Sequence, residues 1–246
     1  RREVPDGAKV GRAGAGTCRH ARAARRLTRG MPLRIDHVTV GAFEENCYLV
    51  ADPESGEAVL VDPGDEFAAI ADLVARHGVT PSAVWLTHAH LDHIGAVSAV
   101  RRAWPGIPVW LHPADAPVYA YAHMAAARYG LPWEQPEPHD RDLADGMCLT
   151  VGAHAFGVWH VPGHAPGHVA FVGEDVVLGG DCLFAGSVGR TDLPLCDPRA
   201  FAASLARLMT LGDAMRVLPG HGPATSIGRE RVANPFLNGQ ARVPGA

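Results

Sequence analysis

The densest group of chemically reactive side chains in this sequence lies between Thr87 and His93. The segment reads Thr-His-Ala-His-Leu-Asp-His, so the imidazoles of His88, His90 and His93 and the carboxylate of Asp92 fall within six residues. Imidazole nitrogen binds zinc, iron and other transition metals, whereas a carboxylate adds negative charge and can bind a second ion. Three histidines so close together serve little structural purpose without a metal, so the segment predicts a metal site.

Three further candidate ligands, His164, Asp181 and His221, each follow a short apolar run that ends in Gly or Pro-Gly. Such runs, bounded by turn residues, are typical of buried strands. Taken alone, a histidine after Pro-Gly is usually a turn residue. In open sheets covered by helices, however, ligands bind beyond the strand ends. The seven donors are therefore expected to meet there, and they suffice for two ions that share one carboxylate.

The order of these donors resembles that of the metallo-β-lactamase-fold hydrolases, and the resemblance covers residues 31–237. Several segments are more specifically similar to the single-domain glyoxalase II-like (hydroxyacylglutathione hydrolase-like) subgroup. These segments are 45–48 (Glu-Asn-Cys-Tyr), 61–64 (Val-Asp-Pro-Gly), 162–168 (Pro-Gly-His-Ala-Pro-Gly-His), 189–192 (Gly-Arg-Thr-Asp) and 234–237 (Asn-Pro-Phe-Leu). The resemblance implies an α/β fold, a four-layer αββα sandwich, formed as a single hydrolase domain by residues 31–246.

The resemblance also divides the donors between two divalent metal ions. It implies that one ion is held by His88, His90 and His164, and the other by Asp92, His93 and His221, with Asp181 bridging. Zinc is the expected metal, and the donor types also suit iron or manganese.

Four carboxylates and imidazoles near the donors have further expected roles. Asp92 and Asp181 are the candidate catalytic residues. Asp62 and His168 are candidates for orienting the ligand imidazoles through their other ring nitrogens, with turn formation and packing as an equal alternative. True β-lactamases of this fold usually carry Cys at the position of Asp181, which argues against that activity.

Two metal ions would supply hydrolytic chemistry, because water bound to a divalent metal has a pKa of about 7. The resemblance implies that a metal-bridging hydroxide attacks an S-2-hydroxyacyl thioester such as S-lactoylglutathione. Arg190 is a candidate for binding a substrate carboxylate, or it forms a structural pair with Asp192. Two-domain glyoxalase II enzymes hold the thiol with a C-terminal helical domain, and only twenty-five residues follow His221 here, so the thiol stays open.

Three other functions remain open at this point. The first is a persulfide dioxygenase of the same fold, with one iron held by the equivalents of His88, His164 and Asp181. The second is hydrolysis of another acyl bond, such as a lactone. The third is a non-catalytic binding module, which would not need the complete set of donors.

Composition favours a cytoplasmic enzyme with a small-molecule substrate. The chain has 246 residues, of which 47% are hydrophobic, enough for one good core. No apolar stretch reaches the roughly 18 residues of a membrane span, and the five scattered cysteines favour a reducing compartment. From Met31 onward thirteen basic residues stand against twenty-four acidic ones, which argues against nucleic acid or an anionic membrane as partner. The oligomeric state is left open.

The first thirty residues differ from the rest, with nine Lys or Arg against two acidic residues. They contain many Gly and Ala, and we expect a disordered basic tail. The segment has no apolar h-region and is not a secretory signal. An Arg-rich, acid-poor segment also resembles a transit peptide, but the favoured interpretation is that Met31 is the natural start.

Hydrophobic patterns predict the elements that position the donors. Strands are expected at 33–40, 48–51, 58–61, 148–151, 154–161, 168–172 and 176–178. Helices are expected from an N-cap at Asp65 to Gly78, over 94–103, and from Asp197-Pro198 to Gly212. Segment 113–145 is either a lid or substrate wall, or it contains a surface helix over 116–129.

Overall fold

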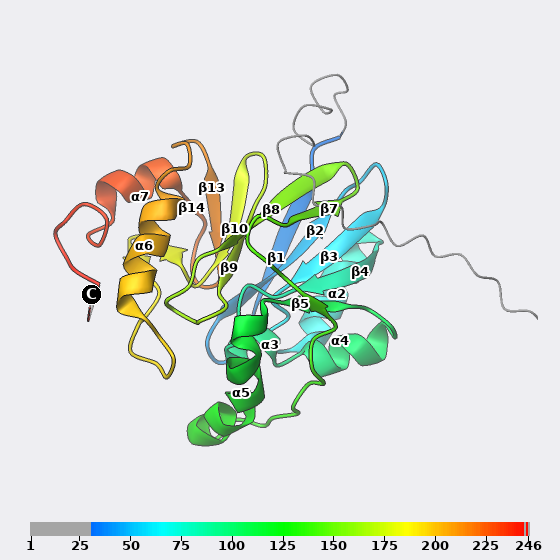
Figure 1. The fold of residues 1–246 in the computed structure, drawn as a ribbon. Coiled ribbons are helices and arrows are strands. Elements are labelled where there is room, and N and C mark those ends of the chain that lie inside the picture. The colour runs from blue at the N-terminus through cyan, green and yellow to red at the C-terminus, as the bar shows by residue number, and fades with distance from the viewer. Residues whose placement is uncertain (1–30, 244, 246) are drawn as a thin grey trace, which may run out of the picture.

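Two β-sheets of six strands each, packed face to face, form the centre of the molecule (Figure 1). The computed structural model describes residues 31–243 and 245. The disorder predicted for residues 1–30 therefore lies outside the described residues.

The first sheet carries the His-x-His-x-Asp-His segment at the end of its fourth strand. Its order is β1 (Arg34–Val40), β2 (Glu45–Ala51), β3 (Glu57–Val61), β4 (Thr80–Trp85), β5 (Val109–Leu111) and β6 (Arg141–Asp142). Strand β2 is antiparallel to both β1 and β3, and the strands from β3 to β6 are parallel to one another. Strand β2 is buried on both faces, which explains its nearly continuous apolar sequence.

The second sheet carries the remaining donors at the ends of three of its strands. Its order is β14 (Thr225–Ser226), β13 (Arg216–Pro219), β10 (Val176–Gly180), β9 (Val169–Val172), β8 (His154–His160) and β7 (Cys148–Val151). Strands β10 and β13 are parallel, and the other neighbours are antiparallel. A separate hairpin of β11 (Leu183–Phe184) and β12 (Ser187–Val188) follows β10.

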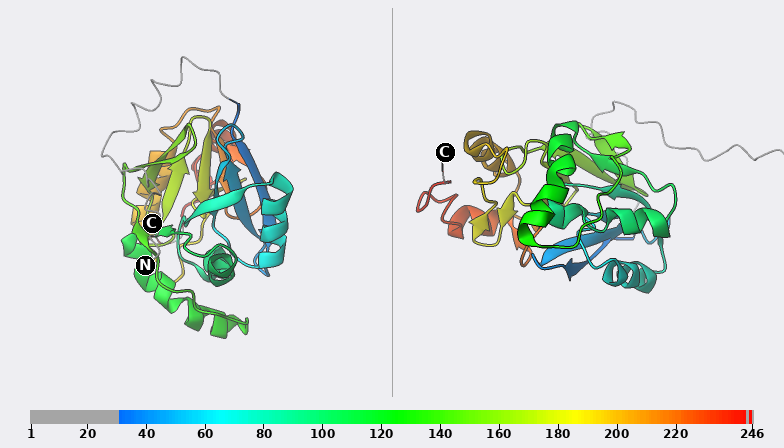
Figure 2. Two further views of the ribbon diagram at one scale, coloured as in Figure 1. Left: turned by 90° about the vertical axis from the view of Figure 1, so that its right-hand side faces the viewer. Right: turned by 90° about the horizontal axis from the view of Figure 1, so that it is seen from below.

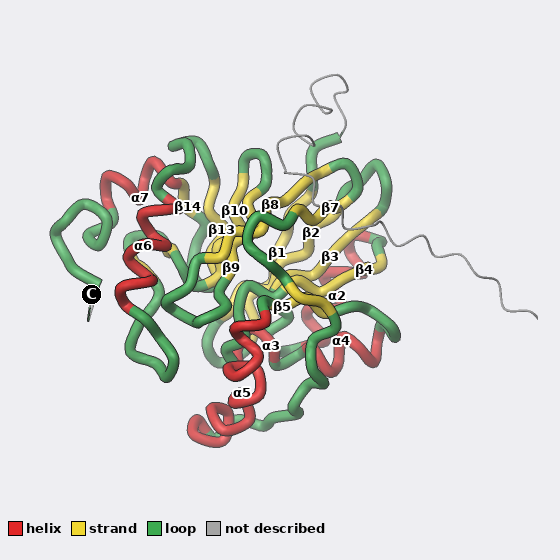
Figure 3. The backbone as a smooth tube through the Cα atoms, in the orientation of Figure 1, coloured by secondary structure: helices red, strands yellow, loops and turns green. Residues whose placement is uncertain are grey.

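Helices cover the outer face of each sheet. On the first sheet lie α2 (Phe67–His77), α4 (Val97–Ala103) and α5 (Ala116–Tyr129), and on the second lie α6 (Pro198–Leu208) and α7 (Ile227–Ala233). The views in Figure 2 show this layering, and Figure 3 shows the loops that join the layers.

Three apolar cores hold these layers together. The middle core joins the two sheets, where Trp85 packs against Phe156 and Phe171 with ring centroids 5.6 and 5.2 Å apart. The other two cores lie between each sheet and its helices. The predicted four-layer αββα fold is confirmed.

Strand β2 begins three residues earlier than the apolar run predicted. Its polar first residues, Glu45 and Asn46, pair with Val40 and Thr39 of β1. An apolar pattern cannot identify these residues as strand, because their side chains are polar and yet buried.

The predicted N-cap of α2 is wrong, while its end is confirmed. The cap position is Glu66, whose backbone is left-handed with φ 44°, and no side chain caps the helix. Asp65 instead accepts a hydrogen bond from the Glu66 N–H at 2.7 Å. The helix ends at Gly78, whose φ of 63° is the left-handed conformation that glycine adopts readily.

The single helix predicted over 94–103 is also wrong, because the structure divides it into α3 (Leu91–Ile94) and α4. At the break, the Ala96 N–H donates to the Pro63 carbonyl at 3.0 Å. Gly95 lies so close to the Gly64 carbonyl that a side chain there would clash with it. The turn that follows β3 therefore interrupts the helix, and it does so beside the donors.

Helix α6 begins as predicted but ends before Gly212. Asp197 accepts hydrogen bonds from the N–H groups of Arg199 and Ala200 at 2.9 and 3.0 Å. The helix ends at Leu208, whose carbonyl accepts from the Leu211 N–H in a short turn.

Candidate metal centre

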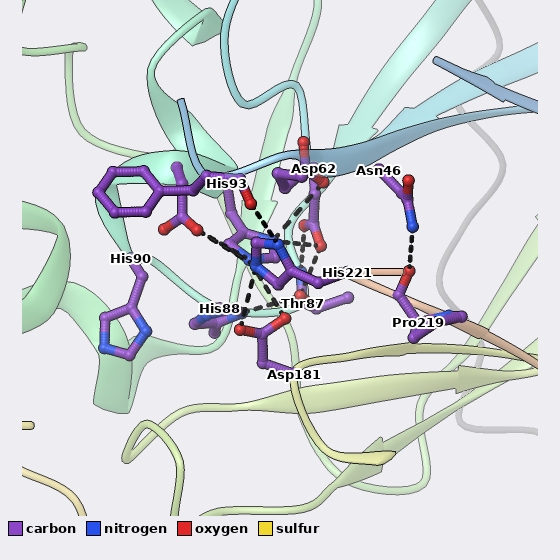
Figure 4. Close-up of polar contacts among 12 residues, drawn as sticks. Asn46, Asp62, Thr87, His88, His90, His93, Asp181, Pro219 and His221 are labelled. Atoms are coloured by element: carbon purple, nitrogen blue, oxygen red, sulfur yellow. Dashed lines mark hydrogen bonds and ion pairs between the residues drawn. The ribbon is translucent and has the colours of Figure 1, made fainter. Parts of the chain in front are cut away.

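The seven predicted donors lie together at one edge of the two sheets, each in the connection that follows a strand. Figure 4 shows five of them, His88, His90, His93, Asp181 and His221. The segment after β4 supplies His88, His90, Asp92 and His93, the last two from α3. The other three follow β8, β10 and β13 in the second sheet and are His164, Asp181 and His221. The two sheets thus contribute complementary parts of one site.

The structure places the donors in two groups. In the first, the ligand atoms of His88, His90 and His164 lie within 4.8 Å of one another, and His90 Nδ1 is 2.9 Å from His164 Nε2. In the second, the ligand atoms of Asp92, His93 and His221 also lie within 4.8 Å of one another.

Asp181 lies between these two groups. Its Oδ2 is 3.5 Å from His164 Nε2 and 3.4 Å from His221 Nε2, while its Oδ1 is 3.4 Å from His93 Nε2. Two ligand atoms that each bind one ion at about 2.1 Å in tetrahedral geometry lie about 3.4 Å apart. The spacing of Asp181 from both groups therefore suits a carboxylate shared by two ions.

Several donor atoms have no hydrogen-bond partner, although they are buried. Among the described residues, these include His88 Nε2, His93 Nε2 and Asp181 Oδ1. Leaving a buried polar atom unpaired costs about 1–3 kcal/mol. His93 Nε2 and Asp181 Oδ1 lie 3.4 Å apart as an ion pair without a hydrogen bond. A bound cation would give all three atoms a partner, so the residues fit a metal centre.

The first group consists of neutral imidazoles. Burial, helped by the neighbouring imidazoles, lowers the pKa of His88 well below its usual value and that of His90 to about 3. Burial also lowers the pKa of His164. Neutral imidazole is the form that binds metal, so this group is prepared for an ion at pH 7.

The second group has the opposite charge state when no cation is bound. Burial opposes the charged form of His93, but Asp181 and Asp92 raise its pKa well above the usual value. Burial likewise opposes that of His221, whose hydrogen bonds to the same carboxylates raise its pKa to about 10. An ion that binds this group must displace protons from both imidazoles.

Contacts to the second ring nitrogen orient the imidazoles. His164 Nδ1 lies 2.8 Å from the Arg190 carbonyl, and His221 Nδ1 lies 2.9 Å from the Phe43 carbonyl. Each Nδ1 therefore donates to an oxygen, which leaves Nε2 as the nitrogen that can bind a metal once it carries no proton.

Asp62 orients His93 as predicted, since its Oδ2 lies 3.0 Å from His93 Nδ1. The same carboxylate accepts from the N–H and hydroxyl of Thr87 at 2.7 and 2.6 Å. Asp62, His88 and His93 form a third cluster of possible ligands, but both oxygens of Asp62 are already engaged by these contacts.

His168 makes no hydrogen bond to a ligand imidazole, so of its two expected roles the structure shows the alternative, packing. Its Nε2 accepts from the backbone N–H of Asp181 at 3.0 Å, and its ring stacks on that of His88 with centroids 4.8 Å apart. The residue positions the strand end that carries Asp181.

For Arg190 both sequence interpretations describe part of the structure. Its Nε and Nη2 donate to the two carboxylate oxygens of Asp192 at 2.6 and 2.8 Å, so the structural pair is present. The same side chain lines the pocket over the donors.

Sequence reasoning missed Asp115, which joins the two halves of the site. Its side chain is fully buried, and it accepts from the Ala89 N–H at 2.7 Å and the Gly167 N–H at 2.6 Å. Burial raises its pKa to about 6. Asp115 ties the loop after β4 to the loop after β8, and nothing in its local sequence predicts partners 26 and 52 residues away.

Asn46 and Tyr48 of β2 hold the loop that carries His221. The Asn46 side chain donates to the carbonyl of Pro219 at 3.2 Å (Figure 4) and to that of Gly222 at 2.9 Å. The Tyr48 hydroxyl also donates to the Pro219 carbonyl, at 2.7 Å. These bonds cross from the first sheet to the second. They give a structural role to the Glu-Asn-Cys-Tyr segment.

A pocket of about 680 Å³ opens above the donors. Helix α5 forms one wall and residues 193–195 form another, while His90, Asp92, His164, Asp181 and His221 are among the lining residues. The surface helix predicted over 116–129 is therefore present, and it is also a wall of the pocket. Among the described residues no helix has the length and apolar character needed to cross a membrane.

Comparisons with known proteins agree with this geometry. A model of the metallo-β-lactamase superfamily matches residues 40–221. Hydroxyacylglutathione hydrolase GloC of Haemophilus influenzae is 34% identical over 214 residues, which cover 85% of this chain and all of that protein.

Two solved structures are also similar. The crystal structure of TTHA1623 in a di-iron-bound form is 48% identical, with a TM-score of 0.76, and the match covers 82% of this chain and 100% of that one. The BLEG-1 B3 metallo-β-lactamase is 38% identical, with a TM-score of 0.74 and coverage of 83% and 99%. Fold, donor set and relatives agree, and the chain belongs to the metallo-β-lactamase superfamily as a metal-dependent hydrolase.

Proposed function

We propose that this protein is a binuclear hydrolase that cleaves the thioester bond of S-2-hydroxyacyl thiols. The observation that carries the proposal is the position of Asp181, 3.4–3.5 Å from donors of both groups. The 34% identity to a hydroxyacylglutathione hydrolase supports the substrate class.

In this proposal His88, His90 and His164 would hold one ion, Asp92, His93 and His221 would hold the other, and Asp181 would be available to both. When bound, the two ions lower the pKa of a coordinated water and polarise the substrate carbonyl. Zinc is our expectation from the donor types, and the di-iron-bound relative with 48% identity makes iron the first alternative.

The protein's own residues keep these donors in place before substrate binds. Asp62 holds His93, the Arg190 carbonyl holds His164, and Asp115 holds the loops on either side. Asp62 and Asp115 are buried, and donors that are held in place before the reaction are the condition for effective electrostatic catalysis.

Where the substrate carries a carboxylate, Arg190 is its proposed contact. Its guanidinium lies at the pocket, and a substrate anion would have to share it with Asp192. The charge of residues 31–246, with twenty-four acidic against thirteen basic residues, supports a small-molecule substrate over nucleic acid.

The test combines metal content with turnover on protein purified without added metal. We expect two metals per chain and release of thiol from S-lactoylglutathione or from a lactoyl ester of another thiol. Asp181→Ala should lose metal and activity together, whereas Asp175→Ala, a substitution of an exposed carboxylate outside the site, should keep both.

Other outcomes of the same test would refute the proposal. One iron per chain with oxygen consumption on a persulfide would identify an oxygenase. Turnover of a lactone or a β-lactam in preference to every thioester would identify another hydrolase, and the β-lactam is included because a B3 metallo-β-lactamase is 38% identical.

A further inference from the structure

The walls of the pocket above the donors are apolar to an extent that a strongly charged substrate does not require. Away from the donors the lining consists mainly of Phe43, Leu91, Val118, Tyr121, Tyr129, Phe184, Val188 and the Leu-Pro-Leu segment 193–195. A cavity of about 680 Å³ has room for a substrate with a substantial side arm.

Helix α5 shows how this apolar wall is built. Pro117, Tyr121, Ala125 and Tyr129 recur every four residues and line the pocket, so they form one stripe along the helix. Other residues of α5 pack against the core of the first sheet. The helix therefore has two apolar faces, and the second one is not needed to attach it to the fold.

The stripe and the opposite wall are exposed to solvent when the pocket is empty. Tyr121 is 40% exposed, Tyr129 50% and Leu195 58%. Exposed large apolar side chains gathered around one opening are typical of a binding site for an apolar group. Phe43 extends this rim, because its ring lies 5.2 Å from that of Tyr129.

Cationic groups, by contrast, are scarce in the pocket. Apart from the histidines of the metal centre, Arg190 is the single basic residue among those that line it. Its guanidinium is already bound through two hydrogen bonds to Asp192. S-Lactoylglutathione carries two carboxylates and one ammonium, so the pocket offers poor charge complementarity to the glutathionyl arm.

We propose that this pocket selects thioesters whose thiol carries an uncharged, apolar arm, which lies against the α5 stripe and residues 193–195. The inference rests on the proposed thioester hydrolysis and names the class of thiol for it. Glutathione, with its charged termini, is then a poor substitute.

The experiment keeps the lactoyl group constant and changes the thiol. The metal-loaded full chain is assayed with lactoyl thioesters of propanethiol, pentanethiol, heptanethiol, N-acetylcysteamine and glutathione. We expect kcat/KM to rise about two- to fourfold with each added methylene. The heptyl ester should exceed the glutathione ester by about tenfold or more, since several methylenes contribute.

Substitutions in the pocket wall test whether the wall causes the preference for long alkyl thiols. Tyr121→Ser should reduce kcat/KM more for the heptyl ester than for the propyl ester. Met124→Ser is the matched control, because Met124 is a 53% exposed apolar residue of the same helix that is not part of the pocket lining. Leu195→Arg should improve the glutathione ester relative to the heptyl ester.

Each result separates the two levels of the proposal. Efficient cleavage of the glutathione ester, with no increase along the alkyl series, would overturn the apolar-thiol inference and leave thioester hydrolysis intact. Cleavage of no thioester at all, glutathione ester included, would overturn both. An unchanged alkyl preference in Tyr121→Ser would show that the preference does not come from the α5 stripe and would overturn the assignment.

Discussion

Asp62→Asn is the substitution that tests most directly how the protein prepares one ligand. Asp62 Oδ1 accepts from the Thr87 N–H, and Oδ2 lies 3.0 Å from His93 Nδ1. In the variant the amide oxygen can keep the bond to the Thr87 N–H, which places the NH₂ group against His93. His93 Nδ1 must then accept, so the proton that the ring keeps is on Nε2, the atom that faces Asp181 and would bind the metal.

The expected loss of metal affinity follows from the hydrogen bond that is lost. A hydrogen bond to a charged group contributes about 1.5–3 kcal/mol. Loss of a contact that orients a metal ligand typically lowers metal affinity about 10–100-fold, which is about 1.4–2.7 kcal/mol. The two estimates agree, and we expect the group of Asp92, His93 and His221 to lose affinity in that range. The group of His88, His90 and His164 should lose less, since Asp62 reaches it only through the Thr87 hydroxyl, which lies 3.0 Å from His88 Nδ1.

The assay is titration of metal-free protein in competition with a chromophoric chelator, with kcat measured at each metal occupancy. Asp52→Asn is the control, because Asp52 is equally buried and accepts hydrogen bonds from Glu54 and Ser55 in a turn outside the donor groups. If Asp62→Asn binds two metals with wild-type affinity, the tautomer of His93 does not limit binding and the reasoning is refuted. Equal weakening of both sites would point instead to general loss of structure, which the melting temperature would reveal.

Three further outcomes are expected. Metal removal by a chelator should abolish activity and lower thermal stability, by about 2.7 kcal/mol for metal at a hundred times its Kd, and an unchanged melting curve would contradict this. In the metal-free protein the pKa of His221 is raised to about 10, so its contribution to stability is complete below about pH 6.5 and is lost as the pH rises through 10. Stability curves of His221→Gln should therefore show a smaller decline, since only His93 still contributes one, and an identical slope in both proteins would exclude the ion pair. Gly220→Ala should reduce metal binding, because a Cβ there would clash with Asp181 Oδ1. Gly212→Ala is the control, because a Cβ at Gly212 has open space, and this variant should bind metal normally. Equal metal binding by both variants would show that the loop around Gly220 moves to accommodate the Cβ.

The sequence predicted the donors well because their chemistry is local. Each one stands directly after an apolar run, and a strand end with a Gly or Pro-Gly turn can be recognised from a few neighbouring residues. The structure brings all seven donors together at the expected edge of the sheets. The αββα fold followed from the same pattern together with the family resemblance.

Element boundaries were less predictable where polar side chains are buried or where segments touch. Glu45 and Asn46 belong to a strand although they are polar, because their partners lie in β1 and in the loop after β13. Helix α3 separates from α4 because the Pro63 carbonyl binds the Ala96 N–H. Neither contact leaves a signal in the local hydrophobic period.

By itself, the sequence determined which atoms are present for chemistry and roughly where each strand delivers them. Only the tertiary structure decided that Asp115 joins two loops, that His168 supports the backbone of Asp181, and that α5 turns an apolar stripe toward the donors. The physical reason is that the direction and burial of a side chain depend on packing between distant segments. Residue type and spacing specify the ligands of a site, whereas its support and the character of its pocket arise when the layers pack together.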